Sequence, residues 1–191
     1  MPAKFRHLVP AIALALFAIA STSASARSIW SDIPRDVTLD IDGDGKPDRA
    51  VLMNATTGST DLYIYLGAGD GLLDPSLTPD IVKKNLTVRF ILTYEATKKG
   101  SLRIGYGCGG CSNDTVTTLT IVHRNGTFWV GGYSYDWETR DFGAGSCDIN
   151  FLTGKATMAK DGGRTRAIKG TFKPVKLADW EEERHVKVCG F

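Results

Sequence analysis

The sequence predicts an all-β fold of antiparallel sheets, arranged as a sandwich or as an open, propeller-blade-like meander with minimal helix. Short β-prone runs alternate with turn signals along most of the chain, which is the pattern of all-β domains. The 191 residues include 21 glycines, a content that suits a fold with many turns. Asn125-Gly126 lies between two of these runs and is typical of a two-residue hairpin turn.

Ten runs are expected to form strands. Each is rich in β-branched or aromatic residues and is bounded by turn-forming residues. In chain order they are Val37–Leu39, Arg49–Asn54, Leu62–Leu66, Leu86–Leu92, Ser101–Tyr106, Val116–Arg124, Thr127–Trp137, Cys147–Leu152, Lys155–Ala159 and Arg166–Phe172. Val82–Glu95 also fits a helix, although its residues Thr87, Val88, Ile91 and Thr93 favour a strand. One short helical turn is expected near Leu177–Glu183.

The Asn125-Gly126 turn predicts the register of the hairpin around it. A type I′ turn places Arg124 opposite Thr127, and the numbers of paired residues then sum to 251. One face of this hairpin is aliphatic and belongs to the core. The other face carries threonines and an aromatic stripe, which is either a second buried layer or an exposed platform for a flat ligand such as a carbohydrate. The residues of this stripe are Trp129, Tyr133, Tyr135 and Trp137.

The N-terminus has the pattern of a secretory signal peptide. Lys4 and Arg6 precede the apolar run Leu8–Ala20, and small residues follow up to a predicted cleavage site after Ala26. We therefore expect residues 1–26 to be removed and residues 27–191 to form a single β-rich domain that is periplasmic or secreted. No later stretch is apolar for long enough to cross a membrane.

The charge of the mature domain is balanced. Removal of Lys4 and Arg6 leaves equal numbers of basic and acidic residues. A neutral domain lacks the basic surface that nucleic acids and anionic membranes require, so neither is expected as a partner. A basic run at Arg164–Lys176 is followed by the acidic segment Asp179–Glu183, and both are expected to be solvated surface.

The stretch DIDGDGKPD, residues 40–48, predicts a metal site. Its aspartates alternate along the chain, and Gly45 permits the sharp turn that lets them converge on one ion. Oxygen ligands without nearby histidine or cysteine favour a hard cation, and an irregular shell of protein oxygens favours Ca2+ over Mg2+. An EF-hand is excluded because Val51 stands where its glutamate is required and because strand-like runs flank the loop. The alternative is a solvated acidic turn.

With these flanks, the segment DVTLDIDGDGKPDRAVLM followed by DLYIYLG resembles the FG-GAP or VCBS type of calcium-binding β repeat, which occurs in integrin α-chain propellers and in many bacterial exported proteins. The resemblance covers about 30 residues. It implies a strand, a calcium loop and a second strand, and a single copy argues against a closed propeller. The ligands that it implies are Asp40, Asp42, Asp44, the carbonyl of Lys46, and Asp48.

The four cysteines predict disulfides, because an even count in an exported chain favours them. Three connectivities are open, and the preferred one pairs Cys108 with Cys111 and Cys147 with Cys189. A soft division near residues 97–100 would separate a calcium-loop half of the domain from this cysteine-containing half.

Motifs for catalysis are weak. Cys108 and Cys111 have redox-motif spacing, but a strand-like run follows instead of a helix. The residues Asp136, Glu138, Asp141 and Asp148 gather near the aromatic stripe, and a glycoside hydrolase needs two such acids. We expect an exported, calcium-stabilised β domain with a binding or structural role in the cell envelope, whose partner is a carbohydrate or an envelope protein and which is not an enzyme. The alternative is a small secreted carbohydrate-active hydrolase that uses carboxylates near Trp137.

Overall fold

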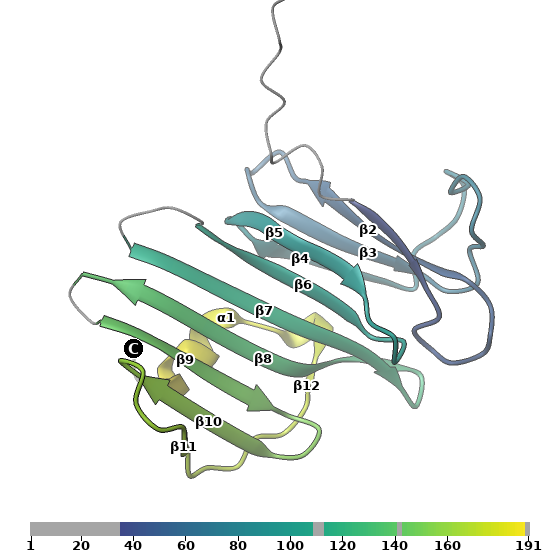
Figure 1. The fold of residues 1–191 in the computed structure, drawn as a ribbon. Coiled ribbons are helices and arrows are strands. Elements are labelled where there is room, and N and C mark those ends of the chain that lie inside the picture. Colours follow the sequence, from purple (N-terminus) through teal and green to yellow (C-terminus); the bar gives the residue numbers. More distant parts are fainter. Residues whose placement is uncertain (1–34, 109–112, 141–142, 190–191) are drawn as a thin grey trace, which may run out of the picture.

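The computed structural model describes residues 35–108, 113–140 and 143–189, and in them the all-β prediction is confirmed. The predicted signal peptide lies outside these residues. The first of two antiparallel sheets has the order β1-β2-β3-β4 (Figure 1), and consecutive strands are neighbours. Its strands are β1 (Asp36–Leu39), β2 (Asp48–Asn54), β3 (Thr60–Tyr65) and β4 (Ile81–Thr87).

The second sheet is wider, with the order β11-β10-β9-β8-β7-β6-β5, and β12 pairs with the start of β8. Its strands are β5 (Phe90–Ala96), β6 (Leu102–Cys108), β7 (Asn113–Arg124), β8 (Thr127–Thr139), β9 (Gly143–Asn150), β10 (Lys155–Lys160), β11 (Arg166–Ala167) and β12 (Val175–Lys176). The chain passes between the sheets at Val88-Arg89, whereas residues 97–100 form the turn between β5 and β6 within the second sheet.

Two predicted strands differ from the observed ones. The run Leu86–Leu92 is not one strand, because β4 ends at Thr87 and β5 begins at Phe90. The helical alternative for Val82–Glu95 is wrong for the same reason. The run Arg166–Phe172 forms a strand only at Arg166–Ala167, where it pairs with β10 at the edge of the sheet.

The hairpin of β7 and β8 has the predicted turn but a different register beyond its first four pairs. Arg124 faces Thr127, and the pairs sum to 251 as far as Ile121 and Val130. Gly131 is then an extra residue, so that Thr120 faces Gly132. A β-bulge of this kind moves every later side chain to the opposite face. The Gly131 carbonyl accepts the backbone N–H of Phe151 at 3.0 Å, which stabilises the bulge from β9's side of the sheet.

The bulge corrects the predicted aromatic stripe. Tyr133, Tyr135 and Trp137 do not share a face with Trp129, because they follow Gly131 and turn into the core. All three are buried, whereas Trp129 is half-buried on the outer face. Of the two alternatives for the stripe, Tyr133, Tyr135 and Trp137 match the buried layer, and the four residues do not form an exposed platform.

Two parts of the chain, one before and one after the second sheet in sequence, cover that sheet. Strands of the first sheet pack over its β5 end, and a segment that we call the C-terminal strap, residues 177–189, lies over β7 to β9 (Figure 1). The strap consists of η2 (Leu177–Asp179), α1 (Glu182–Val186) and η3 (Lys187–Cys189), close to the predicted helical turn. Trp180 of the strap packs its ring on Tyr133 and Phe151, with centroids 5.6 and 6.2 Å apart.

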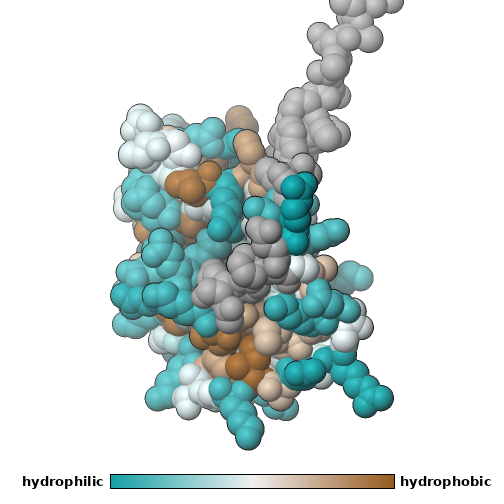
Figure 2. All heavy atoms as spheres, turned by 90° about the vertical axis from the view of Figure 1, so that its left-hand side faces the viewer, coloured by the Kyte–Doolittle hydropathy of each residue, from teal (hydrophilic) through white to brown (hydrophobic). Residues whose placement is uncertain are grey.

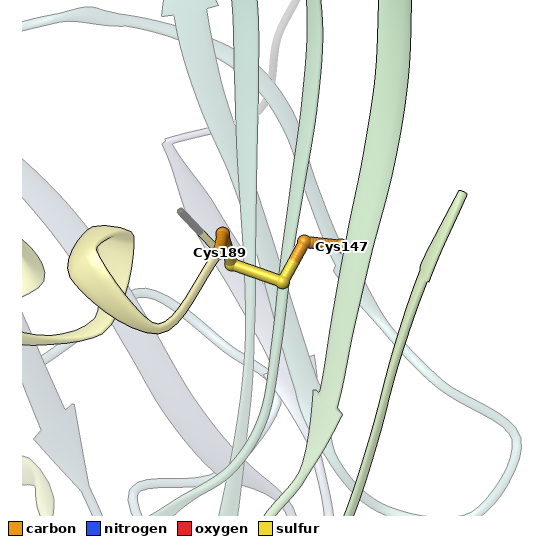
Figure 3. Close-up of a disulfide and its surroundings, with 2 residues drawn as sticks. All are labelled: Cys147 and Cys189. Carbon is orange, nitrogen blue, oxygen red and sulfur yellow. A yellow bond between two sulfur atoms is a disulfide. The ribbon is translucent and has the colours of Figure 1, made fainter. Parts of the chain in front are cut away.

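A disulfide fastens the end of this strap. Cys189 is bonded to Cys147 of β9, with 5.8 Å between the Cα atoms, as the preferred connectivity predicts (Figure 3). Both cysteines are buried. Cys108 ends β6 and is disulfide-bonded, but its expected partner Cys111 lies outside the described residues.

The end of the molecule where β8 ends and β9 begins is mostly hydrophilic, with hydrophobic residues in separate patches (Figure 2). In the described part of the chain, no helix has the length and apolar character needed to cross a bilayer.

Candidate metal centre

The Asp-rich loop lies between two antiparallel strands, as predicted. β1 pairs with β2 so that Leu39 faces Asp48, and residues 40–47 connect the two. Gly43 and Gly45 have φ of +80° and +82°, a region that favours glycine over other residues. These two positions turn the chain tightly enough for carboxylates before and after them to approach one another.

Three carboxylates converge inside this loop. Asp40, Asp42 and Asp48 each offer an oxygen, and these oxygens all lie within 4.8 Å of one another. Oxygens at this spacing can contact a single cation at the 2.3–2.6 Å that calcium uses. The described residues thus contain a group of ligands that matches three of the five predicted from the sequence.

Backbone N–H groups orient these carboxylates. The two oxygens of Asp40 accept hydrogen bonds from Gly43 N at 2.8 Å and from Gly45 N at 3.1 Å, and Asp42 accepts one from Asp44 N at 3.0 Å. Each bond closes a small loop around the carboxylate, which limits the rotamers that the side chain can adopt. The carboxylates are therefore preorganised by the loop itself.

Asp48 anchors the centre to the rest of the first sheet. Its side chain is fully buried, and its two oxygens accept the backbone N–H groups of Ile41 at 2.8 Å and of Gly67 at 2.7 Å. Gly67 follows β3, so this carboxylate joins the loop to a second connection of the sheet. A buried carboxylate needs such donors or a cation, because leaving it without them is costly.

Asp44 does not belong to this group in the described structure. Its carboxylate accepts the backbone N–H of Lys46 at 2.8 Å and pairs with the Lys46 ammonium at 3.1 Å on the surface. The hydrogen bond from the Lys46 backbone and the interaction with its side chain lower the pKa of Asp44. The structure thus leaves Asp44 and the Lys46 carbonyl as ligands implied by the resemblance alone.

Neighbouring segments support the loop. The β5–β6 turn touches it so closely that a Cβ added at Gly100 would lie 2.5 Å from the carbonyl oxygen of Asp40. On the other side, Gly69 N donates to the Pro47 carbonyl at 2.9 Å. At the start of β2, Arg49 pairs with Asp36 and donates to the Gly71 carbonyl. The loop is therefore in contact with segments of both sheets.

Three of the other acidic residues singled out by sequence lie on the outer face of the second sheet. Asp136 and Glu138 of β8 alternate with buried residues, and Asp148 of β9 lies diagonally from Asp136. Burial raises the pKa of Asp136, with a further contribution from Asp148, and burial also raises the pKa of Asp148. Asp141 lies outside the described residues. With Tyr135 and Trp137 buried beneath them, these acids have no aromatic platform beside them.

One group of interacting residues was not predicted. Glu182, which the sequence suggested to be solvated surface, is mostly buried and contacts Arg89 and Thr117. The sequence does not indicate these contacts, because Glu182 lies in an acidic run whose members Glu181 and Glu183 are exposed. A buried tryptophan two residues earlier, Trp180, is the signal that this segment packs on the sheet.

Comparison with known proteins identifies no matching family model, no similar curated protein and no similar solved structure.

Proposed function

We propose that the protein is an exported β domain stabilised by one Ca2+ ion bound in the loop of residues 40–48, with a binding or structural role in the cell envelope. The observation that carries this proposal is the convergence of Asp40, Asp42 and Asp48, whose ligand oxygens lie within 4.8 Å of one another. The antiparallel pairing of β1 and β2 around the loop supports the resemblance to FG-GAP or VCBS repeats.

The chemistry of the donors supports calcium. Each of the three residues supplies carboxylate oxygen, and hard oxygen ligands select hard cations over zinc or copper. Calcium accepts additional carbonyl and water oxygens in an irregular shell, which suits a loop with one buried and two more accessible carboxylates. Asp44 and the Lys46 carbonyl complete the ligand set that we propose.

The proposed role of the ion is structural. Three carboxylates at this spacing repel one another, and a divalent cation converts this repulsion into attraction. The loop contacts the β3–β4 connection through Gly67 and the β5–β6 turn through Gly100. An ion in the loop would therefore stiffen the contact between the two sheets.

Export is supported by the cysteines as well as by the N-terminal pattern. The Cys147–Cys189 disulfide is the kind of bond that forms and persists in oxidising compartments. A disulfide and a bound ion serve the same need in an extracytoplasmic domain, since both stabilise the folded chain without a larger core.

Thermal unfolding tests the proposal. The mature protein with its disulfides intact is stripped of metal with a chelator, dialysed, and melted with and without added CaCl2. We expect the Tm to rise with the CaCl2 concentration, because an ion at one hundred times its Kd stabilises the folded state by about 2.7 kcal/mol. For a domain of this size that corresponds to a rise of about 5–10 °C. Millimolar CaCl2 that leaves the Tm unchanged would show that the loop is an acidic turn without an ion.

A further inference from the structure

Arg89 and Glu182 form an ion pair at the boundary between the sheets and the C-terminal strap. Arg89 lies in the two-residue connection from β4 to β5, and its Nη1 atom is 3.4 Å from Oε1 of Glu182. That nitrogen is buried, and only 19% of the Glu182 side chain is exposed. The Arg89 side chain is 37% exposed, so the pair is partly shielded from solvent, with its contact atoms on the buried side.

A hydroxyl group of the second sheet donates to the same carboxylate. Thr117 of β7 is fully buried and donates its hydroxyl to Oε1 of Glu182 at 2.7 Å. Burial raises the pKa of Tyr106 and of Tyr133, and the nearby Glu182 carboxylate raises both further. A guanidinium and a donating hydroxyl that face one carboxylate are the kind of convergent polar groups that orient a ligand in a binding site.

A large cleft opens beside this group. Its volume is about 890 Å3, and it runs between β4 and the strap. Residues from both sides line it, including Lys83 and Arg89 from the sheet and Trp180 and Glu182 from the strap. A ligand that enters the cleft would meet the Arg89 guanidinium where the Glu182 carboxylate now lies.

The strap is fixed at both ends but exposed between them. Leu177 and Trp180 are buried at its start and Cys189 is bonded to Cys147 at its end, whereas Glu181, Glu183 and Arg184 between these anchors are exposed. Glu182 is thus carried by a five-residue helix that belongs to neither sheet.

We propose that Arg89 and Thr117 form a binding site for the carboxylate of a small organic acid, and that Glu182 fills this site as an internal ligand. The Cys147–Cys189 disulfide keeps the strap, and with it Glu182, in place. An external carboxylate binds by taking the place of Glu182, so the strap acts as an autoinhibitory segment. This site is separate from the loop of residues 40–48.

Chemical rescue by acetate tests the site. Glu182→Ala in the otherwise intact chain removes the internal carboxylate and leaves the buried Nη1 atom of Arg89 without it. We expect its Tm to fall by about 5–10 °C. Sodium acetate should raise the Tm again as its concentration increases, whereas sodium chloride at equal ionic strength should not. Glu183→Ala is the matched control, since it removes the same charge from an exposed position of the same helix, and acetate should not shift its Tm.

A second variant assigns the rescue to the guanidinium. Combining Glu182→Ala with Arg89→Met should abolish the effect of acetate. Equal effects of acetate and chloride on Glu182→Ala, or the same acetate effect on Glu183→Ala, would overturn the proposal and leave a purely structural ion pair.

Should Glu182→Ala fail to fold, Glu182→Gln serves instead, because the amide keeps the size of the side chain and an acceptor for Thr117. Acetate should then accelerate hydrogen exchange of the strap amides, residues 177–189, relative to chloride. Unchanged exchange in that variant would contradict the proposal.

Discussion

Asp48 and Gly67 are joined across 19 residues of sequence by a hydrogen bond of 2.7 Å, from the Gly67 backbone N–H to the fully buried Asp48 carboxylate. The other oxygen of this carboxylate accepts the N–H of Ile41. A single side chain thereby connects the Asp-rich loop with the segment after β3 without a cation. Because Asp48 both anchors the loop and offers a metal ligand, its structural contribution can be measured separately, in the absence of metal.

Asp48→Ala should destabilise the protein even in chelator. The substitution leaves two backbone N–H groups without their acceptor, and each buried unsatisfied donor costs about 1–3 kcal/mol. We expect the free energy of unfolding to fall by about 2–4 kcal/mol in urea titrations with EDTA present. Asp70→Asn removes a charge from an exposed position in the neighbouring connection and should change stability by less than about 0.5 kcal/mol. Equal effects of the two would refute the anchoring role.

Asp42→Asn should weaken calcium binding while leaving the metal-free protein nearly as stable. Asp42 belongs to the convergent group, whereas Asp44 pairs with Lys46 on the surface. Isothermal titration should give a Kd for Asp42→Asn that is higher by about tenfold or more, since ligand charge sets the affinity of such loops.

Asp44→Asn is the comparison that tests the ligand set. The described geometry predicts a smaller increase in Kd than for Asp42→Asn. An equal or larger increase would mean that Asp44 leaves Lys46 and joins the ion, as the resemblance to FG-GAP or VCBS repeats implies.

Replacing both Cys147 and Cys189 with serine should lower stability markedly. The bond closes a loop of 42 residues, and the loss of conformational entropy in the unfolded chain accounts for about 4 kcal/mol. We expect a decrease in Tm of about 10 °C, measured by circular dichroism. A decrease below about 2 °C would indicate that the packing of Trp180 on Tyr133 holds the strap without the bond.

Asp136→Asn should stabilise the protein at neutral pH. Burial and the nearby Asp148 raise the folded-state pKa of Asp136 above its ordinary 3.8, so the folded protein binds this proton more tightly than the unfolded chain. Its contribution to stability is therefore present below pH 3.8 and is lost as the pH rises through the folded-state pKa. Thermal melts should show a higher Tm for the variant at pH 7, and a difference that shrinks on acidification toward pH 4. A variant that is less stable than the wild type at pH 7 would contradict this assignment.

Local sequence signals predicted much of the fold because turn chemistry is local. Asn125-Gly126 correctly placed the hairpin turn and its first four pairs, and the glycines of the Asp-rich loop correctly indicated its tight turn. The break between β4 and β5 carries no glycine or proline. Val88-Arg89 therefore looks like the interior of a strand, and only the packing of two sheets decides that the chain changes sheet there.

The extra residue Gly131 explains why the predicted faces of β8 are wrong beyond it. Because side chains alternate between the two faces of a strand, one extra residue reverses the face of every later side chain, including Tyr133, Tyr135 and Trp137. The adjacent glycines 131 and 132 were a usable signal, because glycine inside a strand often marks a bulge. For the candidate site, alternation grouped Asp40, Asp42 and Asp48, which the structure brings together, with Asp44, which pairs with Lys46 instead. No sequence pattern could bring Glu182 to Thr117 across 65 residues.

The C-terminal strap that covers β8 is synthesised after that strand. The ring of Tyr133 is covered by that of Trp180, which follows it by 47 positions. Until the strap has left the ribosome, this part of the sheet presents an apolar, aggregation-prone surface. We therefore expect a truncated or stalled chain, which lacks the strap, to bind chaperones more readily than the finished domain does.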